Sequence, residues 1–148
     1  MTIYAPRPER VGFTGTRQGM TGFQREVVRK VLLTAMEAHH GDCQGADAEF
    51  HELATAGGIE TVIHPPEDDK LRAWCRGDMV LLAKPYLERN KDIVDLVDVL
   101  VACPKEAKEP RIKRGSGTWQ CIGYARRVGR RTLIVWPDGT SFLEDSRE

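Results

Sequence analysis

Short apolar runs alternate along this chain with longer segments whose apolar residues recur every three or four positions. The runs at 99–103 (VLVAC) and 132–136 (TLIVW) are almost entirely apolar, which is typical of strands buried on both faces. The segment 86–97 repeats at helical spacing instead and leads directly into 99–103. This alternation is the signature of an α/β fold whose sheet is mainly parallel. We expect about five strands.

The same patterns place the remaining elements. Strands are expected at 11–16, near 41–43, and at 60–64, 99–103 and 132–136. Helices are expected from Thr21 to Gly41, at 46–56, at 86–97, and between 115–117 and Gly129, where Trp119, Ile122, Ala125 and Val128 repeat at helical spacing. Thr21 and Gln24 fit a capping box at the start of the first helix, and Gly41 is interpreted as its C-cap. Between 67 and 84, Leu71 and Trp74 favour a short helix, while 79–82 fits either a helical turn or an edge strand.

The chain shows no internal repeat and no interdomain linker, so residues 1–148 are interpreted as one domain with a core at about 10–137. Residues 105–114 form a charged, mostly basic segment without periodicity, and we expect a flexible loop there. Residues 138–148 are expected to be a loose tail.

Charge and hydropathy narrow the classes of partner. The 22 basic and 22 acidic side chains balance to a net charge of zero, which argues against a strongly basic nucleic-acid surface. No apolar run approaches the ~20 residues that a membrane span needs. Residues 1–8 (MTIYAPRP) lack the apolar stretch of a signal peptide. We expect a cytoplasmic protein with no membrane partner.

The cysteines and histidines do not form a recognisable metal motif. The four cysteines lie far apart, with no Cys-x-x-Cys pair, and they are interpreted as buried or half-buried reduced thiols. His39-His40 has no cysteine or carboxylate at ligand spacing and is interpreted as a polar helix end. No metal site is predicted, although Mg²⁺ could arrive with a phosphate-bearing ligand.

Two glycine-rich turns carry the main functional signal. The first spans 12–17 (GFTGTR) and the second spans 114–118 (RGSGT), each between a strand or loop and a helix. Glycine lets the backbone approach a ligand closely, and the free N–H groups at a helix start attract anions. Ligands of open α/β sheets bind outside the carboxyl ends of the strands, where both turns should lie. The alternative is that both are simple tight connections. Neither turn is a Gly-x-Gly-x-x-Gly motif or a P-loop, which counts against a dinucleotide dehydrogenase and an ATPase.

Further polar residues should face the same edge of the sheet. Asp47 follows the second strand, either as a carboxylate that stabilises the helix dipole or as a ligand contact. Arg89, beside Asn90, could pair with phosphate, or form a surface salt bridge with Glu88 or Asp92. The candidate binding residues are Gly12, Thr14, Gly15, Thr16, Arg17, Gly45, Asp47, Arg89, Asn90, Gly115, Ser116, Gly117 and Thr118.

Four other residues are interpreted as structural. Asp95 and Asp98 fit a solvated face and a strand entry better than a catalytic pair. Trp119 and Tyr124 lie at helical spacing and are interpreted as packing residues, although Trp119, beside the second turn, could stack on a base.

At this point the motifs resemble a known family. The ordered set at 12–17, 45–47 (GAD), 85–90 (PYLERN) and 115–119 (GSGTW) resembles the SLOG superfamily, which includes Smf/DprA and the LOG phosphoribohydrolases. It looks most similar to the small YspA-like members of bacteria and phages, and it extends from residue 11 to about 136. The resemblance implies a Rossmann-like three-layer sandwich that holds a nucleotide or nucleotide-derived ligand between the two turns, often in a homodimer or larger assembly.

One departure from the family bears on catalysis. LOG enzymes carry a Gly-Gly-x-Gly-Thr-x-x-Glu motif whose glutamate takes part in cleaving the N-glycosidic bond. Here Arg114 stands at the first glycine and Cys121 at the glutamate. Without that carboxylate, the charge that develops on the ribose has no obvious stabiliser, unless Asp47 or Glu88 substitutes.

Three hypotheses follow. The first is a sensor or sequestering protein that binds a nucleotide-derived small molecule. The second is a phosphoribohydrolase or deoxyribosyltransferase, which release of a free base with time would reveal. The third is single-stranded DNA binding in the manner of DprA, supported only by the basic residues of 105–114 and marked by affinity that falls steeply with salt.

Overall fold

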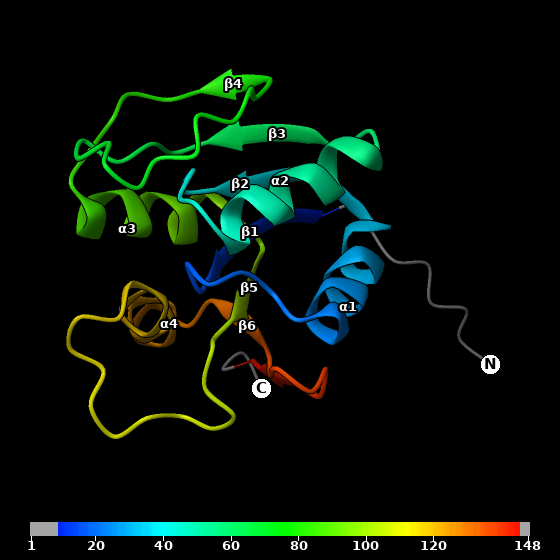
Figure 1. Cartoon of the computed structure of the whole chain (residues 1–148), viewed down its shortest axis with the longest axis vertical. Helices are drawn as coiled ribbons and strands as arrows, with labels where there is room; N and C mark the ends of the chain where they lie inside the picture. The colour runs from blue at the N-terminus through cyan, green and yellow to red at the C-terminus, as the bar shows by residue number, and fades with distance from the viewer. Residues whose placement is uncertain (1–8, 146–148) are drawn as a thin grey trace.

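The computed structural model describes residues 9–145 and shows one sheet with helices on both faces (Figure 1). Its strand order is β4-β3-β2-β1-β5-β6-β7, with every neighbouring pair parallel except β6 and β7. The strands are β1 (Glu9–Gly15), β2 (Ala35–His40), β3 (Glu60–Ile63), β4 (Met79–Val80), β5 (Val99–Cys103), β6 (Arg131–Val135) and β7 (Ser141–Glu144). The helices are α1 (Gly22–Leu32), α2 (Ala46–Ala56), α3 (Tyr86–Leu96) and α4 (Gly117–Val128). The predicted α/β three-layer sandwich with a mainly parallel sheet is confirmed.

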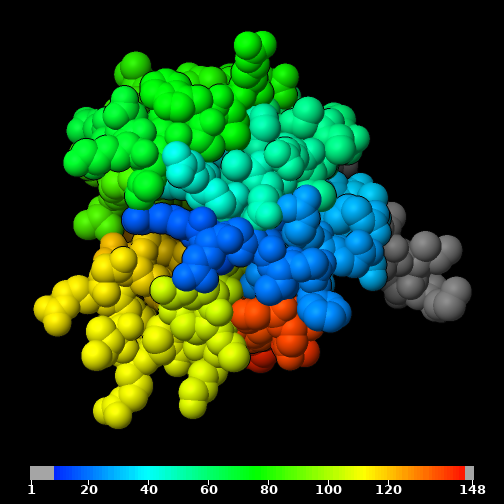
Figure 2. Space-filling model, viewed as in Figure 1, coloured from blue at the N-terminus to red at the C-terminus, as the bar shows by residue number. Residues whose placement is uncertain are grey.

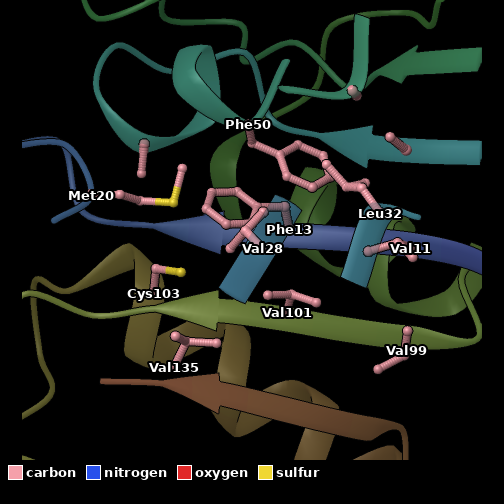
Figure 3. Packing of buried hydrophobic residues seen from close by; sticks show 13 residues of the cluster. Val11, Phe13, Met20, Val28, Leu32, Phe50, Val99, Val101, Cys103 and Val135 are labelled. Atoms are coloured by element: carbon pink, nitrogen blue, oxygen red, sulfur yellow. The ribbon is translucent and has the colours of Figure 1, made fainter. Parts of the chain in front are cut away.

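Two apolar cores lie on opposite faces of the sheet. Alternate residues of β5 divide between them, so that Val99 and Val101 face α1 and α2, and Leu100 faces α3 and α4. In the first core Phe13 of β1 stacks on Phe50 of α2, with ring centroids 4.5 Å apart (Figure 3). Both faces of the central strands are therefore covered, as the uniformly apolar strand patterns predicted.

The first helix is shorter than predicted, and the second strand lies elsewhere. Helix α1 begins at its capping box as expected, but it ends at Leu32, and residues 35–40 form strand β2 instead of the end of the helix. The sequence Ala-Met-Glu-Ala at 35–38 favours a helix by local propensity. Pairing with β1 on one side and β3 on the other overrides that preference. His39 and His40 are accordingly buried strand residues, not a polar helix end.

Two further strands occupy the edges of the sheet. Strand β4 takes the edge-strand alternative for residues 79–82. Strand β7 lies within the predicted tail and pairs antiparallel with β6, so the tail is ordered as far as residue 145. The short helix expected around Leu71 and Trp74 does not form, and Trp74 has a left-handed backbone with φ of 58°. Residues 1–8 and 146–148, which hold the N-terminal segment and the end of the tail, lie outside the described residues.

None of the helices within residues 9–145 is both long and apolar enough to cross a membrane.

Candidate functional site

A cleft of about 630 Å³ opens at the carboxyl ends of β1, β2 and β5. Strand β1 has β2 on one side and β5 on the other, so the strand order reverses at β1. The cleft therefore lies at a topological switch point, where open α/β sheets bind ligands. Figure 2 shows the first turn (dark blue) running between the green segments of β3 to α3 and the yellow loop that precedes α4. Most of the candidate binding residues line this cleft, namely Thr14, Gly15, Thr16, Arg17, Asp47, Arg89, Asn90, Gly115, Ser116, Gly117 and Thr118.

The two remaining candidates, Gly12 and Gly45, shape the cleft from behind without lining it. A Cβ on Gly12 would lie 2.9 Å from side-chain carbons of Ile93 and Val97, so this glycine lets α3 pack directly on β1. Gly45 has φ of +89°, and a Cβ there would lie 2.2 Å from the carbonyl oxygen of Arg17. Both glycines are needed for close backbone approach, which is a structural role.

The start of α4 offers uncapped N–H groups to the cleft. The hydroxyl of Ser116 accepts a hydrogen bond from the amide of Trp119 at 3.2 Å and caps the helix. The amides of Gly117 and Thr118 make no hydrogen bond to another residue among 9–145. A Cβ on Gly117 would meet no atom within 4 Å. Two free N–H groups at the positive end of a helix dipole form an anion site.

The first turn contributes a cation rather than a helix start. Helix α1 begins only at Gly22, Thr21 caps the amide of Gln24 there, and none of its residues lines the cleft. Thr16 holds the turn in place, because its amide donates to the carbonyl of Cys103 at 3.1 Å and its hydroxyl accepts from the amide of Gln18 at 3.1 Å. Arg17 lines the cleft and forms no hydrogen bond or ion pair with any other described residue.

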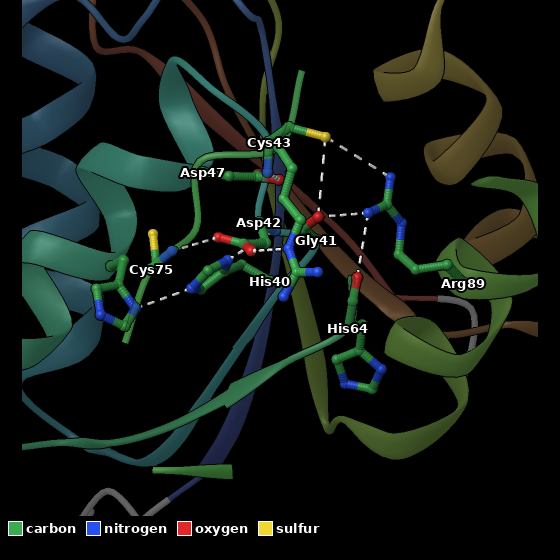
Figure 4. Close-up of polar contacts among 10 residues, drawn as sticks. His40, Gly41, Asp42, Cys43, Asp47, His64, Cys75 and Arg89 are labelled. Atoms are coloured by element: carbon green, nitrogen blue, oxygen red, sulfur yellow. Dashed lines mark hydrogen bonds and ion pairs between the residues drawn. The ribbon is translucent and has the colours of Figure 1, made fainter. Parts of the chain in front are cut away.

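Arg89 forms a buried wall of the cleft. It is 5% exposed, so the alternative of a surface salt bridge with Glu88 or Asp92 is wrong. Its Nη1 donates to the carbonyl oxygens of Gly41 and, at 3.1 Å, His64, as Figure 4 shows. The guanidinium therefore joins the ends of β2 and β3 and brings a positive charge to the cleft.

Asp47 is 7% exposed and lies in the first turn of α2. Its Oδ2 accepts a hydrogen bond from the amide of Cys43 at 3.1 Å. Burial raises the pKa of this carboxyl to about 6, although the positive charge of Arg89 and the backbone hydrogen bonds act in the opposite direction.

Solved structures with this architecture share little sequence with the chain. A molybdenum cofactor binding protein from Rippkaea orientalis superposes with a TM-score of 0.67 at 16% identity, covering 89% of this chain and 78% of that one. The Moco carrier protein of Chlamydomonas reinhardtii gives 0.63 at 18% identity, covering 86% and 76%. DNA processing protein A (DprA) from Streptococcus pneumoniae gives 0.60 at 20% identity, covering 86% of this chain but only half of its own. The chain therefore shares the fold of these proteins. No protein-family model matches the sequence, and no curated protein matches it significantly.

The position that corresponds to the catalytic glutamate of LOG enzymes, by the motif resemblance described above, is part of the core. Cys121 is 1% exposed, packs between α3 and α4, and does not line the cleft. Burial raises the pKa of its thiol to about 12, so it is neither an acid catalyst nor a thiolate nucleophile. Glu88 does not line the cleft either, which leaves Asp47 as the predicted substitute that does.

Several residues of the cleft were not predicted. Some come from the loops after β1 and β2 and from the charged segment, namely Gln18, Gly41, Cys43, Lys105, Glu106 and Ile112. The others lie in regular elements beside the predicted residues, namely Phe13 in β1, Tyr86, Leu87 and Ile93 in α3, and Gln120 in α4. Glu106 accepts a hydrogen bond at 3.1 Å from the indole N–H of Trp119, which packs against Trp136 inside the core. Trp119 is therefore a packing residue, as its helical spacing predicted. Gly41 and Cys43 directly follow β2, so a correct prediction of that strand would have pointed to them.

The charged segment 105–114 has no regular secondary structure, and part of it is held on α4. Glu109 pairs with Lys113 and Arg126, each at 2.7 Å. Asp95 and Asp98 lie outside the cleft, where they accept hydrogen bonds from Tyr124 and from the backbone of Arg10.

One cluster brings metal-ligating residues together from separate segments. His40, His51 and Cys75 place their ligand atoms within 4.8 Å of one another. His40 Nδ1 accepts the amide N–H of Asp42, so its Nε2 carries the proton and donates to His51 Nδ1 at 2.9 Å. Burial and the Asp42 carboxylate raise the pKa of the Cys75 thiol to about 12. The two histidines thus already satisfy each other within the protein, and the cluster fits a hydrogen-bonded support for the loop at 41–44 better than a metal centre.

Proposed function

We propose that this chain binds a nucleotide or a nucleotide-derived small molecule in the cleft and acts as a sensor or sequestering protein. The observation that carries the proposal is the pair of free amides at Gly117 and Thr118, which lie in the same cleft as the unpaired guanidinium of Arg17, all within the described residues 9–145. A phosphate accepts hydrogen bonds from both kinds of donor and gains from the helix dipole.

The size and charge of the cleft support the same ligand class. A volume of about 630 Å³ lies within the range of roughly 300–1,000 Å³ that is usual for small-molecule sites. Arg17, Arg89, Lys105 and Arg114 bring four cationic side chains to its walls. Two solved proteins of the same fold are described as binding or carrying the molybdenum cofactor, which makes that cofactor one of the ligands to test.

A second candidate function is hydrolysis or transfer at the N-glycosidic bond. It is favoured by one observation, the buried Asp47 carboxyl in the cleft, whose pKa of about 6 suits a general acid. It is disfavoured by Cys121, which places a buried thiol where LOG enzymes carry their glutamate. Binding without turnover is therefore the leading proposal.

Native mass spectrometry tests both functions in one experiment. The purified protein is mixed with mononucleotides, dinucleotides, ADP-ribose derivatives and the molybdenum cofactor, and adduct masses are followed with time. A constant adduct supports a binding protein and names its ligand, whereas an adduct that loses its base supports the hydrolase. If no member of the panel binds at millimolar concentration, the proposal is wrong, and single-stranded DNA is tested next by salt-dependent affinity. The same spectra report whether the chain forms the dimer or tetramer that the SLOG resemblance implies.

A further inference from the structure

The cleft contains two carboxylates among its cationic side chains, and they differ in how they are used. Glu106 accepts the indole N–H of Trp119 at 3.1 Å, so its role is at least partly structural. Asp47 is held by backbone amides, those of Cys43 and Gly41. A carboxylate can accept about four hydrogen bonds, so Asp47 retains acceptor capacity where it lines the cleft.

The strand order places Asp47 away from the anion site. Asp47 follows β2, whereas Gly117 and Thr118 follow β5, and β1 lies between these two strands. Neighbouring strands are about 4.8 Å apart, so the ends of β2 and β5, after which α2 and α4 begin, are roughly 10 Å apart. The first turn, with Arg17, lies between them. The α4 end therefore offers amide donors, whereas the other end offers the Asp47 carboxylate near the Arg89 guanidinium.

Electrostatics decides what the Asp47 end can hold. A phosphate beside this buried carboxylate would face a like charge in a poorly solvated place, which costs free energy. A neutral donor group would instead gain a charge-assisted hydrogen bond. Burial raises the pKa of Asp47 to about 6, so at a pH of about 7.5 the group is still mostly ionised and remains an acceptor.

We propose that Asp47 determines specificity by accepting a pair of hydrogen bonds from the end of the ligand that lies away from the phosphate. Two groups offer paired donors of this kind, the two hydroxyls of a ribose and the adjacent N–H groups of a guanine- or pterin-type ring. The inference rests on the proposed function, because it requires the phosphate to occupy the start of α4.

The test measures selectivity by isothermal titration calorimetry at a pH of about 7.5, where the carboxylate is ionised. Wild type, Asp47→Asn and Glu106→Gln are titrated with GMP, its 2′-deoxy analogue and IMP, which lacks the exocyclic amino group. The asparagine side chain matches aspartate in size and keeps an oxygen for the Cys43 amide, so the fold should be retained. Glu106→Gln is the matched control, because it neutralises the other carboxylate of the same cleft.

We expect wild type to prefer GMP over one of the two analogues by about tenfold or more, the scale of a charge-assisted hydrogen bond. That preference should fall to nearly one in Asp47→Asn and persist in Glu106→Gln. Loss of the preference over the deoxy analogue identifies the ribose as the donor, and loss of the preference over IMP identifies the ring. Nucleotide binding whose selectivity survives in Asp47→Asn, or that shows no selectivity in wild type, overturns the inference while leaving the proposed function intact. Failure of wild type to bind any of the three overturns the inference for these ligands, and the proposed function falls only if the full panel of the mass-spectrometric experiment also fails to bind.

Discussion

Gly117→Val is the substitution that separates binding at the start of α4 from stability most cleanly. A Cβ at this position meets no atom within 4 Å, and Gly117 does not have the left-handed backbone that Gly115 and Gly129 adopt. The variant should therefore fold normally. Its isopropyl group would stand beside the two free amides, where the phosphate is proposed to lie.

The expected loss of affinity follows from the hydrogen bonds that the side chain would block. A hydrogen bond to a charged group contributes about 1.5–3 kcal/mol, so displacing the phosphate from one amide should raise the Kd by roughly 10- to 150-fold. Gly123→Ala is the matched control, because Gly123 lies in the same helix, has equally open space around its Cα and does not line the cleft. This control should stabilise the helix by up to about 1 kcal/mol, or raise the Tm by roughly 2–4 °C, without changing the Kd.

Calorimetric titration gives the Kd, and thermal unfolding followed by circular dichroism gives the Tm. Gly117→Val with a wild-type Kd and a wild-type Tm would refute the assignment of the anion site to α4. An equal loss of affinity in Gly123→Ala would point to a change in the helix as a whole.

Four further outcomes are expected. Arg17→Ala should weaken ligand binding by about 1.5–3 kcal/mol at unchanged Tm, since Arg17 has no partner in the described chain, and an unchanged Kd in calorimetry would remove it from the site. Arg89→Met should lower the free energy of unfolding by about 2–5 kcal/mol in urea titrations, because two buried carbonyl oxygens lose their donor, and Arg89→Lys should recover part of the loss. Burial lowers the pKa of His64 from its ordinary value of 6.5 to about 4. Between these two pH values the unfolded chain binds a proton at His64 that the folded chain does not. Acidification through this range should therefore lower the free energy of unfolding by about 3 kcal/mol. Asp47 acts in the opposite direction, because its pKa is raised from 3.8 to about 6 and the folded chain binds its proton first as the pH falls. Urea titrations near neutral pH and near pH ~5 should therefore show a larger acid-induced loss of unfolding free energy in Asp47→Asn than in wild type.

Local patterns were sufficient to predict much of the fold. The bounds of α2 and β5 agree with their predicted ranges, because glycine or proline ends each pattern and the apolar spacing within it is regular. The capping box at Thr21 is also present as expected. Strand β2 was missed because its residues favour a helix locally and become a strand only through pairing on both sides.

In the candidate site, too, residues set by a local sequence pattern could be predicted, whereas residues placed by contacts distant in sequence could not. The glycine-rich turns are contiguous in sequence, so the residues at 14–17 and 115–118 could be placed in the cleft from the pattern alone. The role of Arg89 could not be inferred in this way, since its acceptors are carbonyl groups 48 and 25 residues away. The assembly of His40, His51 and Cys75 likewise depends on the course of an irregular loop that carries no periodic signal.

The most direct test of the central claim is a titration of ¹⁵N-labelled protein with the best ligand of the panel, followed by two-dimensional NMR. The amides of Gly117 and Thr118 should show the largest shifts, with Arg17 next, because these groups are proposed to contact the phosphate. The amide of Gln24, already bonded to the Thr21 hydroxyl at 3.1 Å at the start of α1, should remain in place. Ligand binding that leaves Gly117 and Thr118 unshifted, or that moves residues outside the cleft instead, would contradict the account.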